Sequence, residues 1–309
     1  MELLRNTKFD FINKHRTGFL ISAVIIVIGL VFLAMNGGPH FGIDFRGGVK
    51  VLAKFNRMVT EAELQAKLSE LGYPRAQIQL DPDQNEATIS IATQAMERLP
   101  EMESSAGRTL NDALLEGGDG WHALPEGVNV SEVGPSVGRD LQWAALWSVL
   151  WSIVILLVYI SWRFEFRFAI GAIAALVHDV LITLGIFAVL AKEINLPTVA
   201  AFLTIIGYSL NDTIVVFDRI RENTQTLRGT PYVDVLNRSI NQSLSRTVIT
   251  SLTTLFVVLV IFTLSSAGAE INTFALALIV GVVIGTYSSV FIASPILYIW
   301  HQRQRETEA

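Results

Sequence analysis

The chain has 309 residues, of which 51% are hydrophobic and only 17% are charged. Soluble domains carry about 25% charged residues, so this composition favours a membrane protein. The net charge of −5 argues against a nucleic-acid-binding protein, and the absence of cysteine excludes both a disulfide framework and a thiolate metal site.

Two further absences narrow the class of protein. The five histidines are scattered through the sequence without metal-ligand spacing, at positions 15, 40, 122, 178 and 301. No GxxxxGK[ST] phosphate loop occurs, which argues against an ATPase. We therefore expect no resident metal and no cofactor.

Long apolar stretches dominate the chain. A helix needs about 20 apolar residues to cross the hydrocarbon core of a membrane. Six stretches approach that length and predict an all-α membrane domain: 18–35, 141–161, 168–190, 196–217, 247–266 and 272–297. The first follows basic residues, as in a signal peptide, but no A-x-A cleavage site comes after it, so we interpret it as an uncleaved anchor.

The distribution of Lys and Arg predicts the orientation of these spans. Basic residues concentrate in the two terminal tails and in the loops after the second and fourth spans, whereas the two short opposite loops hold only Lys192. We therefore expect cytoplasmic tails at 1–17 and 298–309. The segment 36–140 is expected on the opposite side of the membrane, with the five remaining spans over 141–297.

The segment 36–140 has the size of one small domain. Alternation and turn signals predict strands, and capping and periodicity predict helices. In chain order these are a strand at Gly48–Phe55, a helix from Thr60 to near Gly72, strands at Gln77–Leu80 and Glu86–Ile91, a helix at Glu97–Leu115 and a strand at Val128–Val133. The order β-α-β-β-α-β predicts an α+β domain of the ferredoxin-like type.

Two carboxylates fall inside the predicted spans. Asp179 follows His178 near the middle of the third span, and Asp212 lies in the fourth. A charge at bilayer depth costs about 2.5–3.5 kcal/mol on insertion scales, so such residues usually face a bundle interior and carry protons or ions. The alternative is an interhelical hydrogen bond that only joins helices.

Polar neighbours favour a functional role for Asp212. The fourth span places Ser209, Asn211 and Thr213 beside it. The fifth span adds a hydroxyl stripe at helical spacing: Thr247, Thr250, Ser251 and Thr254. Arg246 stands at the cytoplasmic end of that stripe, where it either pairs with Asp212 or anchors the helix at the membrane surface. In the sixth span, Gly281 and Gly285 form a GxxxG pattern that predicts close helix packing.

Glycine-rich segments flank the outer domain. One is the run Phe41–Gly48, and the other is the run Gly134–Gly138. We interpret them as hinges that join the domain to the membrane spans. The residues assigned to these hinges are Gly42, Asp44, Phe45, Gly47, Gly48, Gly134, Pro135 and Gly138.

These two segments and the run NDTIVVFDRIREN at 211–223 together resemble the SecF proteins of the SecD/SecF protein-export family, in the resistance-nodulation-division superfamily. GIDFRGG alone would also fit SecD, but the third motif, the short outer domain and the length favour SecF. The resemblance covers essentially the whole chain. It implies a transport component rather than an enzyme, driven by the proton-motive force in late steps of preprotein translocation. It also implies a place in the bacterial inner membrane, with 36–140 in the periplasm.

The resemblance also implies partners and residue roles. SecD would supply the other six spans, with the SecYEG channel, YajC, YidC, translocating preproteins and membrane lipid as further partners. Asp212 would be the principal proton-responsive group and Arg246 its conduction-linked neighbour, with Asp179 and His178 as weaker candidates for the proton pathway.

Two other readings stay open. One is a scaffold subunit that does not handle protons, and the other is half of a lipid or small-molecule exporter of the same superfamily. A membrane protease is disfavoured because the sequence contains neither HExxH nor a Ser/His pair placed for catalysis.

Overall fold

The computed structural model describes residues 7–308 except 75, 83, 93–105, 119 and 266–269. Six helices in it are long and apolar enough to cross a membrane, as predicted. They are α1 (His15–Met35), α6 (Pro135–Arg163), α7 (Phe166–Val189), α8 (Leu196–Thr226), α9 (Tyr232–Leu264) and a last helix that comprises α10 (Glu270–Ser288), the π-helical turn η1 (Ser289–Ala293) and α11 (Ser294–Glu308).

Several helices extend beyond the predicted spans. α8 continues to Thr226, and α9 begins at Tyr232, well before the predicted start at 247. The early turns of α9 are amphipathic and bury Val235, Leu236 and Ile240 against the bundle. Hydropathy detects only the apolar part of a helix, whereas packing of an amphipathic face continues it into the aqueous layer.

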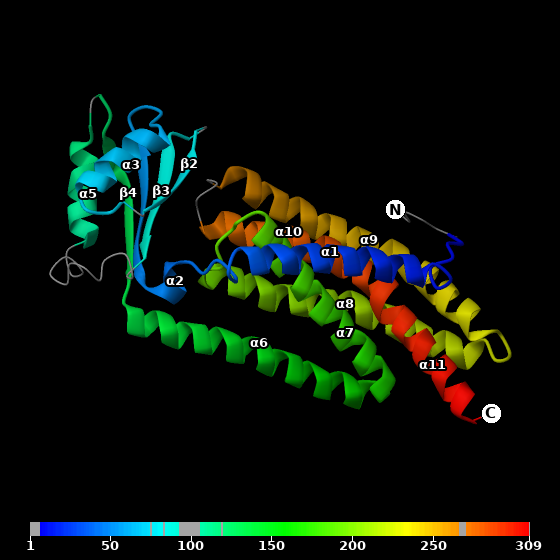
Figure 1. Ribbon diagram of the computed structural model, residues 1–309. Coiled ribbons are helices and arrows are strands. Elements are labelled where there is room, and N and C mark those ends of the chain that lie inside the picture. Colours follow the sequence, from blue (N-terminus) through cyan, green and yellow to red (C-terminus); the bar gives the residue numbers. More distant parts are fainter. Residues whose placement is uncertain are drawn as a thin grey trace.

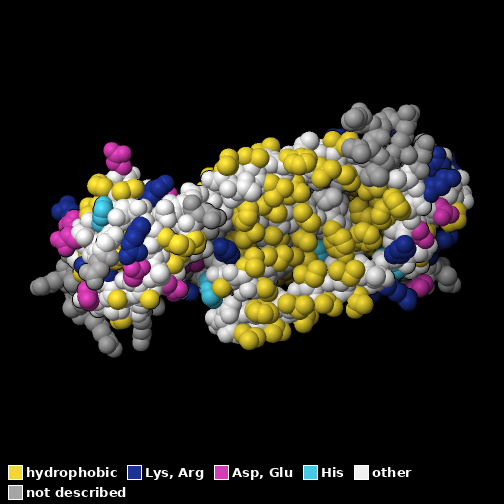
Figure 2. Space-filling model, turned by 90° about the horizontal axis from the view of Figure 1, so that it is seen from above, with side chains coloured by type: hydrophobic (Ala, Val, Ile, Leu, Met, Phe, Trp, Pro, Cys, Tyr) yellow, Lys and Arg dark blue, Asp and Glu magenta, His cyan; other side chains and the backbone are white. Residues whose placement is uncertain are grey.

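The helix bundle has the sheet domain at one end and both chain termini at the other (Figure 1). α7, α8 and α10 form its centre, where buried small and aromatic side chains such as Ala172, Phe217 and Ala293 pack together. α6 lies at the side of the bundle. Hydrophobic side chains cover the middle of the molecule, and charged side chains gather at its two ends (Figure 2). This distribution fits a bundle surrounded by lipid.

The outer domain contains one four-stranded sheet in the order β2-β3-β1-β4, with every neighbouring pair antiparallel. Its strands are β1 (Gly48–Phe55), β2 (Gln77–Asp81), β3 (Glu86–Ala92) and β4 (Ala123–Val133), and its helices are α3 (Glu61–Glu70) and α5 (Ala106–Glu116). This arrangement confirms the predicted ferredoxin-like fold. The predicted helix from Glu97 falls partly on 97–105, outside the described residues.

The central strand of this sheet, β1, forms the core of the domain. Val49, Val51, Ala53 and Phe55 alternate along it and are all buried. They pack with Leu64 and Leu68 of α3 and Leu110 and Leu114 of α5. The period-2 pattern in the sequence therefore corresponds to one buried face of the sheet.

The predicted capping box opens α3. The Thr60 hydroxyl accepts a hydrogen bond from Glu63 N, and the Glu63 carboxylate accepts one from Thr60 N at 2.8 Å. Hydrogen bonds from Arg57, and then from Thr60, lower the pKa of Glu63 to about 2. The carboxylate form that completes the box is therefore present throughout the neutral range.

Replacing Thr60 by Ala should loosen α3 without changing the rest of the domain, because one helix amide loses its acceptor. We expect amide exchange in α3 to rise about fivefold, the equivalent of about 1 kcal/mol. Hydrogen exchange of the full chain measures this effect. Ser69→Ala is the matched control, since the Ser69 hydroxyl bonds only the Gln65 carbonyl within the same helix. Equal exchange in both variants would contradict a stabilising role for the cap.

Candidate functional site

Close packing of α8 and α10 brings polar side chains together inside the bundle. A methyl group on Gly281 would overlap the Ile205 side chain, and one on Gly285 would lie 3.0 Å from Ser209 Cβ. The absence of side chains at these two glycines lets the helices approach closely, as the GxxxG pattern predicts. Two buried carboxylates, Asp212 and Asp179, lie beside this contact on α8 and α7.

Asp212 is only 2% exposed, yet it has little hydrogen bonding. The Ser251 hydroxyl of α9 donates to it at a long 3.4 Å and also lies 2.6 Å from the Thr286 hydroxyl of α10. Thr247 lies one turn from Ser251 on α9, and its buried hydroxyl has no hydrogen-bond partner among the described residues. Asp212 is thus buried near hydroxyl groups, and its described hydrogen bonding is weak.

The predicted ion pair between Asp212 and Arg246 is absent from the described part of this conformation. Arg246 is exposed, and no ion pair within 4.0 Å involves it among the described residues. Arg246 lies five residues before Ser251 on α9, and the side chain that faces Asp212 is Ser251. Its role as a neighbour in proton conduction stays a prediction.

Most of the other predicted support residues do not reach Asp212. The hydroxyls of Thr213, Thr250 and Thr254 bond carbonyls of their own helices, at 2.9–3.1 Å. Such local bonding is common for Ser and Thr in helices. Asn211 is exposed on the surface of α8, and Ser209 bonds Asp179. Of the predicted set, Ser251 alone makes a described hydrogen bond to Asp212.

Asp179 is 1% exposed and is fully hydrogen-bonded. Its Oδ1 lies 2.8 Å from His178 Nδ1, and its Oδ2 accepts from the hydroxyls of Ser209 at 2.5 Å and Ser288 at 2.8 Å. On the other side, His178 Nε2 lies 2.9 Å from the Ser22 hydroxyl of α1. The predicted pair of Asp179 and His178 is therefore part of a network that joins four helices.

Sequence reasoning missed four members of these two sites: Ser22, Thr286, Tyr287 and Ser288. The available signal was a hydroxyl inside an otherwise apolar span, which is costly unless it is bonded. Many spans carry such hydroxyls, however, and only helix contacts select the ones that reach a carboxylate.

The glycine-rich segment before the outer domain is attached to the start of α8. Asp44, in the short helix α2 (Ile43–Arg46), accepts a hydrogen bond from Leu196 N at 2.7 Å. Gly42 N donates to the Ile194 carbonyl at 2.8 Å. A carboxylate at a helix N-terminus is stabilised by the helix dipole, so Asp44 fixes α2 on α8.

The second glycine-rich segment packs against the first. Gly134 and Pro135 start α6, and Gly138 lies in its first turns. A methyl group on Gly138 would lie 2.9 Å from the Phe45 carbonyl oxygen, to which Gln142 of α6 also donates at 2.7 Å. The two predicted hinges therefore form one junction that connects α6, α8 and the sheet domain. Their movement stays a prediction.

The outer domain also contacts the helix bundle through charged groups. Lys50 of β1 lies 3.5 Å from Glu270 at the start of α10. Lys50 also lines a cavity of about 330 Å³, which Glu193 borders from the connection between α7 and α8. Burial raises the pKa of Glu193, although Lys50 and Arg46 oppose this effect. This contact between the outer domain and the helix bundle is therefore polar.

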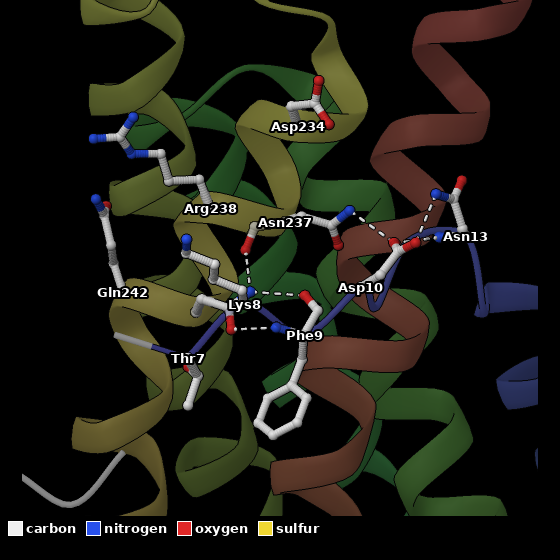
Figure 3. A pocket seen from close by; sticks show the side chains of 10 residues that line it. Thr7, Lys8, Phe9, Asp10, Asn13, Asp234, Asn237, Arg238 and Gln242 are labelled. Carbon is white, nitrogen blue, oxygen red and sulfur yellow. Dashed lines mark hydrogen bonds between the residues drawn. The ribbon is translucent and has the colours of Figure 1, made fainter. Parts of the chain in front are cut away.

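At the opposite end of the bundle, the N-terminal segment lies on the early turns of α9 and borders a cavity of about 690 Å³ (Figure 3). Phe9 N and O are both bonded by the side-chain amide of Asn241, and Asn237 accepts from Phe11 N and Ile12 N. Residues 9–12 of the tail predicted at 1–17 are thus bound to the helix bundle.

Among the described residues, no group of three His, Asp or Glu side chains is placed to bind a metal ion.

The bundle of six apolar helices, the ferredoxin-like domain and the buried carboxylates define a multi-pass helical membrane protein. The profile of the family described as "Protein export membrane protein SecD/SecF, C-terminal" matches residues 122–303. The chain is 39% identical to protein translocase subunit SecF of Thermodesulfovibrio yellowstonii over 97% of both chains. It is 38% identical to SecF of Haemophilus influenzae over 94% of this chain and 85% of that one.

The chain also resembles a longer protein. It is 37% identical to protein translocase subunit SecDF of Thermus thermophilus over 99% of this chain and 40% of that protein. The crystal structure of that SecDF, described as a translocon-associated membrane protein, superposes with a TM-score of 0.82 and covers 98% of this chain and 40% of that chain. The chain therefore belongs to the SecD/SecF family, and its full-length relatives named here are SecF subunits.

Proposed function

We propose that this chain is an accessory subunit of the Sec preprotein translocase that uses the proton-motive force, together with a SecD partner, to promote late steps of translocation across the bacterial inner membrane. Membership of the family supports the translocase role. The observation that carries the proton coupling is Asp212, a carboxylate with 2% exposure whose one hydrogen bond in the described part of the chain is long. The coupling ion is a proton in this proposal.

Asp212 is suited to change its charge during a cycle. Burial disfavours the charged carboxylate, and one hydrogen bond of 3.4 Å stabilises it only weakly, so the neutral acid is accessible. A proton that moves through about 100 mV releases about 2.3 kcal/mol, which biases a two-state equilibrium tens of fold. Arg246, one to two turns away from Ser251 on α9, would pair with the charged form in another state of the bundle.

A single helix links Asp212 to the outer domain. α8 runs without interruption from Leu196 to Asp212, a rise of about 24 Å at 1.5 Å per residue. At its start, Asp44 joins it to α2, which leads directly into β1. A shift of α8 on protonation would therefore reach the sheet domain through the junction, and the domain would hold or release an emerging polypeptide in the periplasm.

The surface of α8 supports a membrane partner. Within the part of α8 from 200 to 217, the exposed residues are small or polar and recur at helical spacing: Ala200, Thr204, Gly207 and Asn211. The exposed face of α9 instead carries Phe256, Val257 and Leu264. Small and polar faces suit contacts between membrane helices, whereas large apolar side chains suit lipid. We place the SecD subunit on the α8 face, and expect contacts with SecYEG, YajC and YidC elsewhere.

A photo-crosslinking amino acid at Asn211 tests this placement. We expect an adduct with the SecD subunit when the two are produced together, because the α8 face would lie against it. The same amino acid at Phe256, which is 67% exposed on α9, should give no such adduct. Gel analysis of irradiated membranes is the measurement. Adducts from Phe256 but not from Asn211 would move the partner to another face.

The rival reading is a scaffold subunit that joins SecD to the channel without handling protons. The hydrogen bond described for Asp212, from Ser251, can also be accepted by an amide oxygen, so a scaffold would tolerate Asn at that position. Precursor accumulation in cells that carry Asp212→Asn tests the proposal, and a scaffold predicts none.

A further inference from the structure

The pair of Asp179 and His178 differs in kind from Asp212, although both sites are buried carboxylates. Every side-chain polar atom of the pair is hydrogen-bonded, and its partners outside α7 come from three neighbouring helices: Ser22 of α1, Ser209 of α8 and Ser288 of α10. None of these groups is charged. The ring of Tyr287 stacks on that of His178, with ring centroids 6.1 Å apart.

The hydrogen bonds around His178 determine where its protons lie. The Tyr287 hydroxyl donates to the Gly18 carbonyl at 2.7 Å, because a carbonyl only accepts. Tyr287 therefore accepts from the Ser22 hydroxyl, which is 3.2 Å away. The single proton of Ser22 is used in that bond, so His178 Nε2 must donate to Ser22 at 2.9 Å. Nε2 thus carries a proton.

The Asp179 side then has one proton to share. Oδ2 accepts from Ser209 and, at 2.8 Å, from Ser288, whose hydroxyl lies farther from its other acceptor, the Gly285 carbonyl, at 3.2 Å. This leaves the 2.8 Å contact between Oδ1 and His178 Nδ1. That contact needs one proton, either on Nδ1 as a charged pair or on Oδ1 as a neutral acid facing a neutral imidazole. Both arrangements contain the same number of protons and have no net charge.

Loss of this proton would leave an uncompensated carboxylate against a lone pair on Nδ1, and gain of a second would leave a net positive charge at bilayer depth. Both changes are costly at a buried site whose described hydrogen-bond partners are all uncharged. We infer that Asp179 and His178 hold one shared proton permanently and act as positioning residues, which fix α1 and the Ser209 turn of α8 beside Asp212. They do not carry protons across the membrane.

This inference rests on the proposed function but makes a separate prediction for substitution. In Asp179→Asn, the amide nitrogen can donate to His178 Nδ1, and the amide oxygen can accept from Ser209 and Ser288. The amide thus reproduces the neutral-acid arrangement. A proton carrier cannot work with Asn in place of Asp, whereas a permanently neutral pair can. Asp179→Leu, in contrast, removes all three bonds.

The test compares Asp179→Asn, Asp179→Leu and Asp212→Asn in cells that also make the SecD partner, by precursor accumulation and membrane level. We expect Asp179→Asn to export within about twofold of wild type and Asp179→Leu to lower the membrane level. Asp179→Asn at normal level with export reduced tenfold or more would overturn the inference. Normal export by Asp212→Asn would instead reject the proposed proton coupling.

A second measurement does not depend on export. Nitrogen NMR of histidine-labelled protein, with His178 assigned by its loss in His178→Gln, reports the protonation of each ring nitrogen. Nε2 of His178 should carry a proton, both in the wild-type chain and in Asp179→Asn, because it donates to Ser22. A spectrum in which Nε2 of His178 lacks a proton would overturn the inference whatever the result for Asp212.

Discussion

Replacing Asp212 by Asn is expected to abolish proton-dependent export while the chain stays folded, inserted and paired with its partner. Asn has nearly the same shape and can still accept from Ser251, so the packing of α8 on α9 and α10 is retained. It cannot gain or lose a proton. Export should fall tenfold or more, toward the level of cells without the chain. Pulse-labelling of unprocessed secretory precursors measures this change.

Asp218→Asn provides the matched control. Asp218 lies on the same helix and is also an acid, but it is exposed and its contact with Arg163 is a surface pair at 3.5 Å. Such pairs contribute little to stability, so this variant should export normally. Unimpaired export by Asp212→Asn, at normal membrane level, would assign Asp212 to helix packing and favour the scaffold reading.

Replacing Gly48 by Ala should produce a large loss of stability in the outer domain. Gly48 has φ of +143°, a conformation that L residues rarely adopt, and a methyl group there would overlap the carbonyl oxygen of Ile91. It also starts β1, which pairs with both β3 and β4, so the backbone cannot move away without breaking the ladder. The combined strain and overlap should cost about 2–5 kcal/mol.

Thermal unfolding and limited proteolysis of the full chain measure this cost. Gly38→Ala is the control, because Gly38 has a similar φ of +121° but nothing within 4 Å of an added methyl group. This control measures the cost of the positive φ without the steric overlap, and it should lower the free energy of unfolding by about 1–2 kcal/mol. Equal stability of the two variants would show that the junction adapts freely at Gly48.

The sequence by itself was sufficient for the architecture. Six apolar stretches predicted six membrane helices, because only a helix satisfies its own backbone in lipid. Alternation in Gly48–Phe55 and the capping box at Thr60 predicted β1 and the start of α3, since both signals are local. The helix ends were less well predicted, as at α9, because amphipathic turns outside the membrane depend on packing.

Only the tertiary structure determined how the polar residues divide between the two carboxylates. Ser209 and Asp212 are three residues apart, yet Ser209 bonds Asp179 on α7 and Asp212 faces Ser251 on α9. Side chains three residues apart lie on one side of a helix, only about 60° apart around its axis, so the spacing alone does not separate their partners. Which neighbours they meet depends on how each helix is rotated. The close contact at Gly285 brings Ser209 to α10, where Ser288 completes the Asp179 site. Helix rotation and crossing depend on contacts between residues far apart in the chain, so no local pattern specifies them.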